Sequence, residues 1–225
     1  MGGAVSIGSA ASGDVRGTVR IRDVAYGPET SEFTLFDHRF VVPLAGEFNV
    51  RNAAMAVAAA HFYQLPLETL AAGLREFGGI RRRQEVRGEK RGITVIDDFG
   101  HHPTAIRETL RGLRRKYPHR RLWAIFEPRS NTTRRAVFQK DLPSALALAD
   151  GVFVAQVAAL EQIPVHERLN PEQVVADINA AGVPAYYEPD ATAIVAKLNP
   201  LLKPGDVVVV FSNGGFGGIH QKLLA

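Results

Sequence analysis

Residues 93–104 read Ile-Thr-Val-Ile-Asp-Asp-Phe-Gly-His-His-Pro-Thr, an apolar run that leads into a polar loop and then into a proline suited to the first turn of a helix. Apolar runs also lead into polar loops at 122–132, Leu-Trp-Ala-Ile-Phe-Glu-Pro-Arg-Ser-Asn-Thr, and at 207–218, Val-Val-Val-Val-Phe-Ser-Asn-Gly-Gly-Phe-Gly-Gly. Loops that leave the carboxyl ends of parallel strands meet at one edge of a sheet. The three loops therefore predict one site for a polar ligand.

Strand and helix patterns alternate from residue 84 to the end of the chain. We expect strands at 84–87, 93–97, 122–126, 152–155, 184–188 and 207–211, and helices at 104–117, 135–149, 171–181, 191–202 and from 219 onward. In the first of these helices, Ile106, Leu110, Leu113 and Tyr117 recur at helical spacing. Such alternation predicts a Rossmann-like α/β fold with a mostly parallel, doubly wound sheet.

The chain has a different pattern before residue 80. Short strands are expected at 16–24, 32–36 and 39–44, followed by helices at 49–63 and 67–77. The pair Gly78-Gly79 stands where the pattern changes and is a flexible joint. We therefore expect two domains, 1–79 and 80–225, the first of them small, with antiparallel strands and helices.

Composition narrows the function classes. The chain has 225 residues, 46% of them hydrophobic, no cysteine, and 27 Lys and Arg against 23 Asp and Glu. The absence of cysteine excludes disulfides and thiolate chemistry. No apolar run has membrane-spanning length and the first residues do not form a secretory signal, so we expect a cytoplasmic protein with no membrane partner. The basic runs at 81–83, 111–116 and 134–135 lack interleaved aromatics, which favours small anionic ligands over nucleic acid.

The pattern Asp97-Asp98-x-x-His101-His102 is a candidate for chemistry. Carboxylates and imidazoles at this spacing can bind a divalent metal or hold a ribose and phosphate. The other five histidines show no pairing at ligand spacing, so we expect no metal site. A structural alternative is that Asp98 and His102 cap the helix that Pro103 opens.

Three further features have a ligand interpretation and a structural one. The run 213–218 can expose backbone amides to an anion or be a plain turn. One cation of 81–83 can reach phosphates, or the run is a solvated surface. Asn49 and Asn52 share a helix face, where Asn49 can instead be the N-cap. A G-x-x-x-x-G-K-[ST] phosphate loop and a serine-nucleophile elbow are both absent from the sequence.

Five motifs occur in the order found in a known family, over roughly residue 14 to the end. They are 46–53 (Gly-Glu-Phe-Asn-Val-Arg-Asn-Ala), 81–85 (Arg-Arg-Arg-Gln-Glu), 97–106 (Asp-Asp-Phe-Gly-His-His-Pro-Thr-Ala-Ile), 126–132 (Phe-Glu-Pro-Arg-Ser-Asn-Thr) and 212–224 (Ser-Asn-Gly-Gly-Phe-Gly-Gly-Ile-His-Gln-Lys-Leu-Leu). The chain resembles the second half of the Mur ligases. The fourth and fifth motifs are similar to those of the family members that join UDP-N-acetylmuramate to the tripeptide L-alanyl-γ-D-glutamyl-meso-diaminopimelate in cell-wall recycling.

The resemblance implies that 1–79 is the tail of a central ATPase domain and that 80–225 is the C-terminal domain. It implies an ATP-dependent carbon–nitrogen ligase that uses Mg²⁺, held mainly by upstream segments, and an acyl phosphate. The partners would be UDP-N-acetylmuramate and the tripeptide. Because this chain lacks the phosphate loop, we expect it to be inactive alone.

Roles for individual residues are also implied by the resemblance. The nucleotide would be contacted by Asn49, Asn52, Arg83, Asp98 and His102, and the peptide by Arg129, Ser130, Asn131, Thr132, Asn213 and Gly214. No catalytic residue is assigned. The family commonly has histidine where Phe48 stands, so a polar contact by that ring would be lost here.

Two other function classes remain open at this stage. One is a metal-dependent phosphoesterase that uses Asp97, Asp98, His101 and His102. The other is a non-catalytic module that binds a nucleotide or a peptide.

Overall fold

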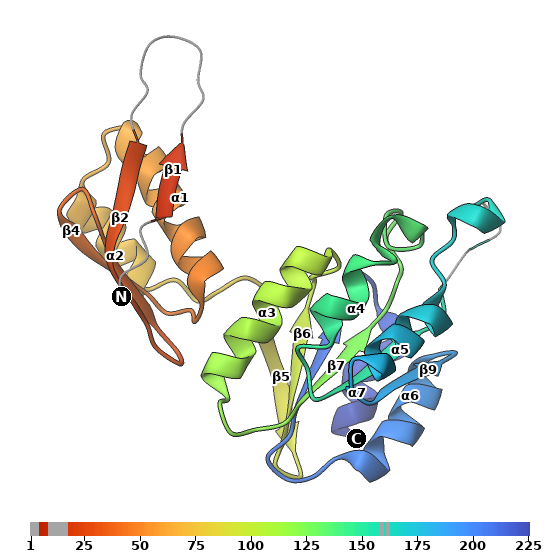
Figure 1. Cartoon of the computed structure of the whole chain (residues 1–225). Helices are drawn as coiled ribbons and strands as arrows, with labels where there is room; N and C mark the ends of the chain where they lie inside the picture. Colours follow the sequence, from red (N-terminus) through yellow and green to blue (C-terminus); the bar gives the residue numbers. More distant parts are fainter. Residues whose placement is uncertain (1–4, 9–17, 158–159, 161–162) are drawn as a thin grey trace. The chain divides into compact units, whose positions relative to one another are not determined.

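The computed structural model describes residues 5–8, 18–157, 160 and 163–225. The chain divides into two compact units, Met1–Gly79 and Ile80–Ala225 (Figure 1). The division falls directly after the Gly78-Gly79 pair, where few side chains are available to pack. Each unit has its own hydrophobic core.

The first unit is a small antiparallel sheet covered by two helices. Its strands are β1 (Val5–Gly8), β2 (Thr18–Tyr26), β3 (Ser31–Leu35) and β4 (His38–Val42), paired in that order, and its helices are α1 (Glu47–Phe62) and α2 (Leu67–Arg75). The rings of Phe33 and Phe40 stack at 5.4 Å between centroids and are fully buried. Strand β1 was not predicted, because four residues give too few alternations to recognise a strand. Residues 16–17 of the predicted strand 16–24 lie outside the described residues.

The second unit contains the predicted Rossmann-like sheet. Its strands are β5 (Glu85–Lys90), β6 (Ile93–Asp98), β7 (Leu122–Phe126), β8 (Gly151–Ala155), β9 (Ala185–Glu188) and β10 (Val207–Phe211), in the spatial order β5-β6-β10-β7-β8-β9. Only β5 is antiparallel to its neighbour. The last strand in the sequence therefore lies between β6 and β7, which makes their carboxyl ends neighbours.

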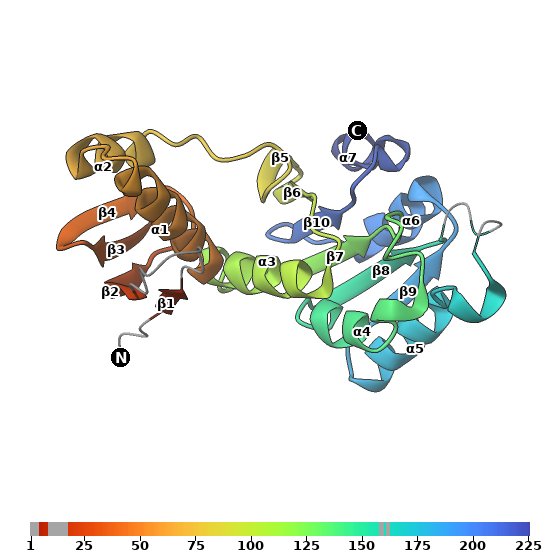
Figure 2. The same cartoon turned by 90° about the horizontal axis from the view of Figure 1, so that it is seen from above.

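Helices cover both faces of this sheet, as expected for a doubly wound fold (Figure 2). Helices α3 (Pro103–Lys116), α4 (Asp141–Leu146) and α5 (Pro171–Ala180) pack on one face, and α6 (Ala191–Leu198) and α7 (Ile219–Leu224) pack on the other. Alternate valines of β10 serve the two cores: Val207 and Val209 belong to one and Val208 and Val210 to the other. This two-sided burial explains the continuous apolar runs of the sequence.

Two predicted helices are shorter than expected. The segment 135–149 contains a 3₁₀ turn, Ala136–Phe138, before α4, because Arg135 pairs with Arg168 in a β-bridge and the backbone there is extended. The segment 191–202 is helical to Leu198 and continues as a 3₁₀ turn, Asn199–Leu201, because Pro200 has no amide hydrogen to donate. No helix of the described residues is long and apolar enough to cross a membrane.

Candidate functional site

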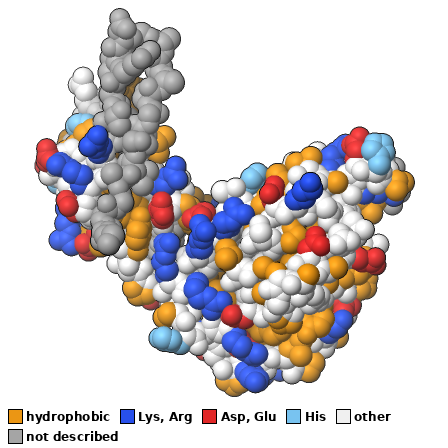
Figure 3. All heavy atoms as spheres, viewed as in Figure 1, with side chains coloured by type: hydrophobic (Ala, Val, Ile, Leu, Met, Phe, Trp, Pro, Cys, Tyr) orange, Lys and Arg blue, Asp and Glu red, His pale blue; other side chains and the backbone are white. Residues whose placement is uncertain are grey.

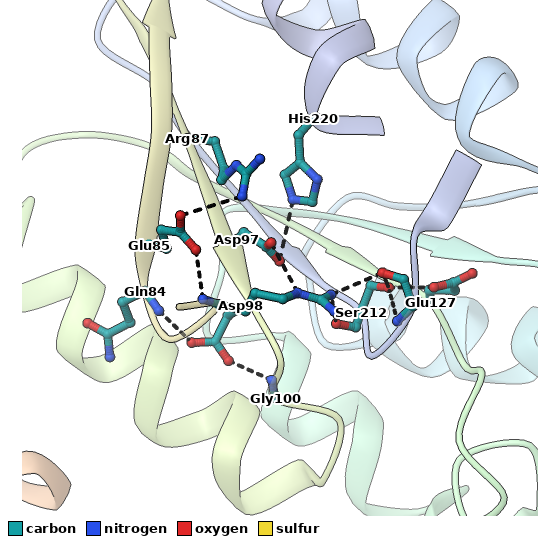
Figure 4. A network of polar contacts seen from close by, with 11 residues as sticks. Gln84, Glu85, Arg87, Asp97, Asp98, Gly100, Glu127, Ser212 and His220 are labelled. Carbon is teal, nitrogen blue, oxygen red and sulfur yellow. Dashed lines mark hydrogen bonds and ion pairs between the residues drawn. The ribbon is translucent and has the colours of Figure 1, made fainter. Parts of the chain in front are cut away.

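The loops after β6, β7 and β10 meet at one edge of the six-stranded sheet, as the sequence predicted. The amide of Ser212 donates to the carbonyl oxygen of Asp98 at 3.1 Å, and the amide of Glu127 donates to the carbonyl oxygen of Phe211 at 3.0 Å. The ladder of parallel strands thus continues into the loops. Figure 4 shows the polar side chains that gather there.

Arg82 is the hub of this cluster. Its Nε donates to Asp97 Oδ2 at 3.2 Å, and its Nη2 donates to the carbonyl oxygens of Ser212 at 2.6 Å and Gly214 at 3.0 Å. No role was predicted for Arg82, and phosphate binding was expected of Arg83. The triple arginine alone does not tell which member turns inward, and the choice of Arg83 came from the family resemblance.

The arginine turn, residues 82–85, is held in an uncommon backbone conformation. Arg82 and Gln84 have positive φ values of 59° and 52°, which cost roughly 1–3 kcal/mol each for residues other than glycine. Hydrogen bonds on both sides offset this cost: the amide of Arg82 donates to Glu85 Oε2 at 2.7 Å and the amide of Phe99 donates to the carbonyl of Arg82 at 2.7 Å. The turn leaves Arg83 exposed, with its guanidinium carbon 5.8 Å from the centroid of the Phe99 ring.

Asp97 is an ionised carboxylate at the centre of the cluster. Burial by itself raises the pKa of Asp97, but His220 and Arg82 outweigh that effect, and the pKa is lowered from its ordinary value of 3.8. His220 Nε2 lies 3.5 Å from Asp97 Oδ1, a distance at the outer limit of a hydrogen bond. Asp97 therefore provides the negative charge that fixes Arg82.

Asp98, an expected ribose contact, is 1% exposed and accepts three internal hydrogen bonds. Its donors are the amide of Gly100 at 2.7 Å, the amide of Gln84 at 3.0 Å and the hydroxyl of Thr109 at 3.3 Å. Burial raises the pKa of Asp98, and the Gly100 and Gln84 amides, the charge of Arg83 and the Thr109 hydroxyl oppose this. In this structure Asp98 joins the arginine turn to the loop after β6. Thr109, on α3, was not foreseen.

The two histidines of the loop have different partners. His102 is the N-cap of α3, and its Nδ1 accepts a hydrogen bond from the amide of Thr104 at 3.2 Å. The structural alternative for His102 is thus confirmed, whereas Asp98 does not cap the helix. His101 Nδ1 lies 3.1 Å from the carbonyl oxygen of Phe99.

The loop after β7 is tied to the loop after β10. Ser212 Oγ donates to Glu127 Oε2 at 2.5 Å, and both side chains are buried. Arg129 is exposed, and its Nη1 lies 3.7 Å from Glu127 Oε1. A Cβ atom on Gly214 would stand 2.6 Å from Cδ and Nε of Arg129, so this arginine lies directly against the glycine. Glu127 and Ser212 belong to two of the sequence motifs, but their contact was not predicted.

The remaining expected peptide contacts lie in the same two loops. Ser130 Oγ is 2.8 Å from the hydroxyl of the buried Thr133, which orders the turn, and Asn131 Oδ1 accepts from Arg134 at 2.5 Å. Thr132 and Asn131 are exposed. Asn213 Oδ1 is buried and has no hydrogen-bond partner among the described residues.

The expected adenine contacts, Asn49 and Asn52, belong to the first unit. Asn49 does not cap α1: the N-cap is Gly46, with a φ of 101°, and Asn49 Nδ2 donates to the carbonyl oxygen of Ala45 at 2.7 Å. The helix begins two residues earlier than predicted, because glycine adopts this φ without strain. Asn52 is exposed one turn along, and Phe48 is half-buried in the first turn.

The basic run 111–116 lies on α3, where Figure 3 shows Lys and Arg side chains on the surface. Arg111 pairs with Glu108 at 3.0 Å and Arg114 pairs with Asp150 at 2.7 Å. Nearby acids thus balance part of this charge. The run is therefore a solvated helix face.

The geometry does not favour a metal-dependent phosphoesterase. Over the described ranges, no three His, Asp or Glu side chains are grouped so that they could hold a metal ion. Asp98 and His102 are occupied by backbone amides, and Asp97 faces Arg82 and His220. The four residues proposed for that chemistry therefore do not present their ligand atoms to one point.

Comparison with known proteins identifies the family. Residues 82–214 match the model of the Mur ligase glutamate ligase domain. The chain belongs to the Mur ligase family. The match begins at Arg82 and ends at Gly214, so it contains the arginine turn, the loops after β6 and β7, and the first three residues of the loop after β10.

Among the similar proteins of this family are two named UDP-N-acetylmuramate–L-alanyl-gamma-D-glutamyl-meso-2,6-diaminoheptandioate ligase. The one from Escherichia coli K12 is 43% identical over 182 residues, which cover 80% of this chain and 38% of the relative. The one from Haemophilus influenzae is 40% identical over 206 residues, 87% of this chain and 42% of the relative. The chain thus spans about two fifths of the length of these Mur ligases.

A solved Mur ligase has the same fold. The chain in the crystal structure of a murein peptide ligase from Psychrobacter arcticus is 34% identical in sequence and superposes with a TM-score of 0.67. The superposition covers 91% of this chain and 43% of that one. The sequence resemblance to the Mur ligases is therefore confirmed.

Proposed function

We propose that this chain is the C-terminal part of a cytoplasmic, ATP-dependent ligase that joins UDP-N-acetylmuramate to L-alanyl-γ-D-glutamyl-meso-diaminopimelate. The identity of 43% to the E. coli protein of that name supports the substrate pair. In the proposed reaction, ATP phosphorylates the muramate carboxylate and releases ADP. The peptide amine then attacks the acyl phosphate, forms the amide and releases phosphate. Neither nucleic acid nor membrane is a partner in this proposal.

The two structural units would have separate tasks. Residues 1–79 would be the end of the central ATPase domain, contributing Asn49 and Asn52 near the adenine. Residues 80–225 would be the C-terminal domain, contributing Arg83 to the phosphates, with His102 near the nucleotide. Asp98 would serve the ribose side by holding the arginine turn and the loop after β6 together. Its Oδ1, which among the described residues accepts from the amide of Gly100, would have a second lone pair to accept from a ribose hydroxyl.

Magnesium, when bound with ATP, would neutralise phosphate charge. The described residues do not group into a site that fits this ion, so we assign it no ligand in this chain. Exposed Arg83 is the residue of the arginine turn that can supply positive charge to a phosphate, because Arg82 is engaged by Asp97 and two carbonyl groups.

Peptide recognition would belong to the loops after β7 and β10. The observation that carries this proposal is the position of Arg129, an exposed guanidinium held beside Glu127 and against Gly214. A planar guanidinium suits bidentate binding of a peptide carboxylate. Ser130, Asn131, Thr132 and Asn213 would orient the peptide backbone, and the unpartnered Asn213 Oδ1 could accept a peptide amide.

Calorimetry with the 225-residue chain tests the assignment. We expect it to bind the tripeptide and not L-alanine, and we expect Arg129→Ala to weaken that binding. Binding of L-alanine in preference to tripeptide would contradict the proposed substrate and indicate a ligase that joins L-alanine. A folded chain that binds neither would remove peptide recognition from these loops.

An activity assay tests the division of labour. Supplied with ATP, magnesium, UDP-N-acetylmuramate and tripeptide, the chain alone should make no product, because its sequence lacks the phosphate loop. Product formation at the rate of a full-length ligase would contradict the assignment of 1–79 as only the end of an ATPase domain.

A further inference from the structure

We infer that Arg82 is a positioning residue that sets the place of Arg129, acting through the backbone of Gly214. This inference deepens the proposed function and rests on it for the identity of the ligand, a peptide carboxylate. The geometry on which it stands is internal to residues 80–225.

The first step is the contact between Arg82 and the loop after β10. One nitrogen, Nη2, donates to the carbonyl oxygens of both Ser212 and Gly214, at 2.6 and 3.0 Å. The two carbonyls flank Asn213, so a single guanidinium fixes the direction of two peptide units. Lysine could supply the charge, but it lacks the planar fork that contacts Asp97 with one nitrogen and the carbonyls with another.

The second step is the contact between Gly214 and Arg129. The close approach of Cδ, Nε and Cζ of Arg129, 2.6–2.8 Å from where a Cβ atom would be, means that only glycine allows this packing. The φ of Gly214 is not positive, so backbone conformation does not explain the need for glycine. Its lack of a side chain matters because Arg129 occupies that space.

The third step is the support behind Arg82 and Arg129. Asp97, 5% exposed at its side chain, balances the charge of Arg82, and His220 stands on the far side of Asp97 (Figure 4). Ser212 Oγ, besides donating to Glu127, accepts from the amide of Gly214 at 3.0 Å. Gly214 is thus held at its carbonyl by Arg82 and at its amide by Ser212. Glu127, bonded to the same serine, pairs with Arg129.

These contacts make a continuous path from the arginine turn to the exposed guanidinium of Arg129. Arg83, proposed for the phosphates, is the neighbour of Arg82 in the sequence. One backbone turn therefore positions Arg83, on the nucleotide side, directly. It positions Arg129, on the peptide side, indirectly through Arg82 and Gly214. We assign Arg82 no contact with either substrate.

Nuclear magnetic resonance of the ¹⁵N-labelled chain tests the positioning without any ligand. The observed signals are the amide of Gly214 and the side-chain Nε–H of Arg129, the latter assigned by its loss in Arg129→Lys. We expect Arg82→Lys to shift or broaden both signals. The matched control is Arg87→Lys, because Arg87 is an exposed arginine on the adjacent strand that contacts Glu85 at 3.5 Å, and it should leave both signals unchanged.

Tripeptide affinity gives the second readout. We expect Arg82→Lys to weaken tripeptide binding about tenfold, within the range of one charge-assisted hydrogen bond, and Arg87→Lys to leave it within about twofold. Gly214→Ala should weaken it similarly by displacing Arg129 from the other side of the contact. The double variant should lose less than the product of the two single effects, because both act on one contact.

The outcomes separate the two proposals. Unchanged signals of Gly214 and Arg129 in a folded Arg82→Lys chain would overturn the positioning role, whatever the ligand. Fully multiplicative effects of Arg82→Lys and Gly214→Ala would overturn the route through Gly214. A wild-type chain that binds no tripeptide would contradict the proposed function, and the resonance comparison would still decide the role of Arg82. Should Arg82→Lys fail to fold, Asp97→Asn loosens Arg82 without removing it and should move the same two signals.

Discussion

Ser212 and Glu127, 85 residues apart, are joined by a buried hydrogen bond of 2.5 Å from Ser212 Oγ to Glu127 Oε2. The bond links the loops that follow two neighbouring parallel strands, β10 and β7. A short hydrogen bond to a carboxylate is stronger than one between neutral groups. It therefore fixes the spacing between the loops proposed to hold the peptide.

Ser212→Ala should lower the free energy of unfolding by about 1–3 kcal/mol, because it leaves a buried carboxylate oxygen of Glu127 without its donor. Urea unfolding followed by the fluorescence of Trp123, the single tryptophan of the chain, reports on the unit that contains both loops. Ser144→Ala, at an exposed serine on α4, is the control and should change the free energy by less than about 0.5 kcal/mol. Equal effects of the two substitutions would show that the buried bond adds no stability.

Asp97→Asn should remove a pH-dependent part of the stability. The pKa of Asp97 is lowered in the folded protein, so its ionised form stabilises the fold above 3.8, and this contribution is lost as the pH falls through the folded-state pKa. The difference in free energy of unfolding between wild type and Asp97→Asn should therefore be larger at neutral pH than well below 3.8. Asp98, whose pKa is shifted in the opposite direction, is present in both proteins, so its contribution to the difference in free energy of unfolding largely cancels. A difference that does not vary with pH would contradict the ion pairing of Asp97.

Gly151→Ala should destabilise the second unit by about 1–3 kcal/mol, the usual cost of overpacking a core. A Cβ atom at this position would stand 2.3 Å from Cζ3 of the Trp123 ring, on the adjacent strand. The control is Gly215→Ala, where no atom lies within 4 Å of the added carbon. The midpoint of urea unfolding should fall for Gly151→Ala and stay close to wild type for the control.

Arg83→Ala, in a full-length ligase that contains this chain, should reduce turnover much more than thermal stability. Arg83 is exposed, with its guanidinium carbon over the Phe99 ring at 5.8 Å from the centroid, whereas the proposed contact with phosphate is charge-assisted. Lysine should restore turnover poorly because it lacks the planar fork. Turnover at the wild-type rate in a variant that melts earlier would instead make Arg83 a structural surface charge.

Arg129→Ala in the same full-length ligase should raise the KM for tripeptide about ten- to a hundredfold, as expected for one charge-assisted contact of roughly 1.5–3 kcal/mol. The KM for UDP-N-acetylmuramate should stay within about twofold, because binding to one substrate alone is lost. Steady-state kinetics with each substrate varied in turn separates the two constants. Damage to both, or to neither, would place Arg129 outside the peptide site.

The sequence by itself determined the architecture and the edge of the sheet where the site lies. The apolar run 207–211 predicted a strand buried on both faces, and the alternate valines of β10 indeed enter two different cores. The polar loops after 96, 126 and 211 predicted convergence, since strand polarity places their carboxyl ends together. These features are local patterns, and burial of the apolar side chains follows from them nearly independently of the rest of the chain.

Only the tertiary structure decided which side chains face one another within that site. Arg81, Arg82 and Arg83 are identical in the sequence, yet the turn directs the half-buried guanidinium of Arg82 toward Asp97 and exposes Arg83. Asp97 and Asp98 are adjacent, yet the alternation of the strand places His220 and Arg82 beside Asp97, where their charges lower its pKa, while burial raises the pKa of Asp98. The sequence placed Gly214 in the predicted site but did not show why glycine is needed there, because the need arises from the side chain of Arg129, 85 residues away. Partners such as these are set by strand order and backbone angles, which short-range sequence patterns do not specify.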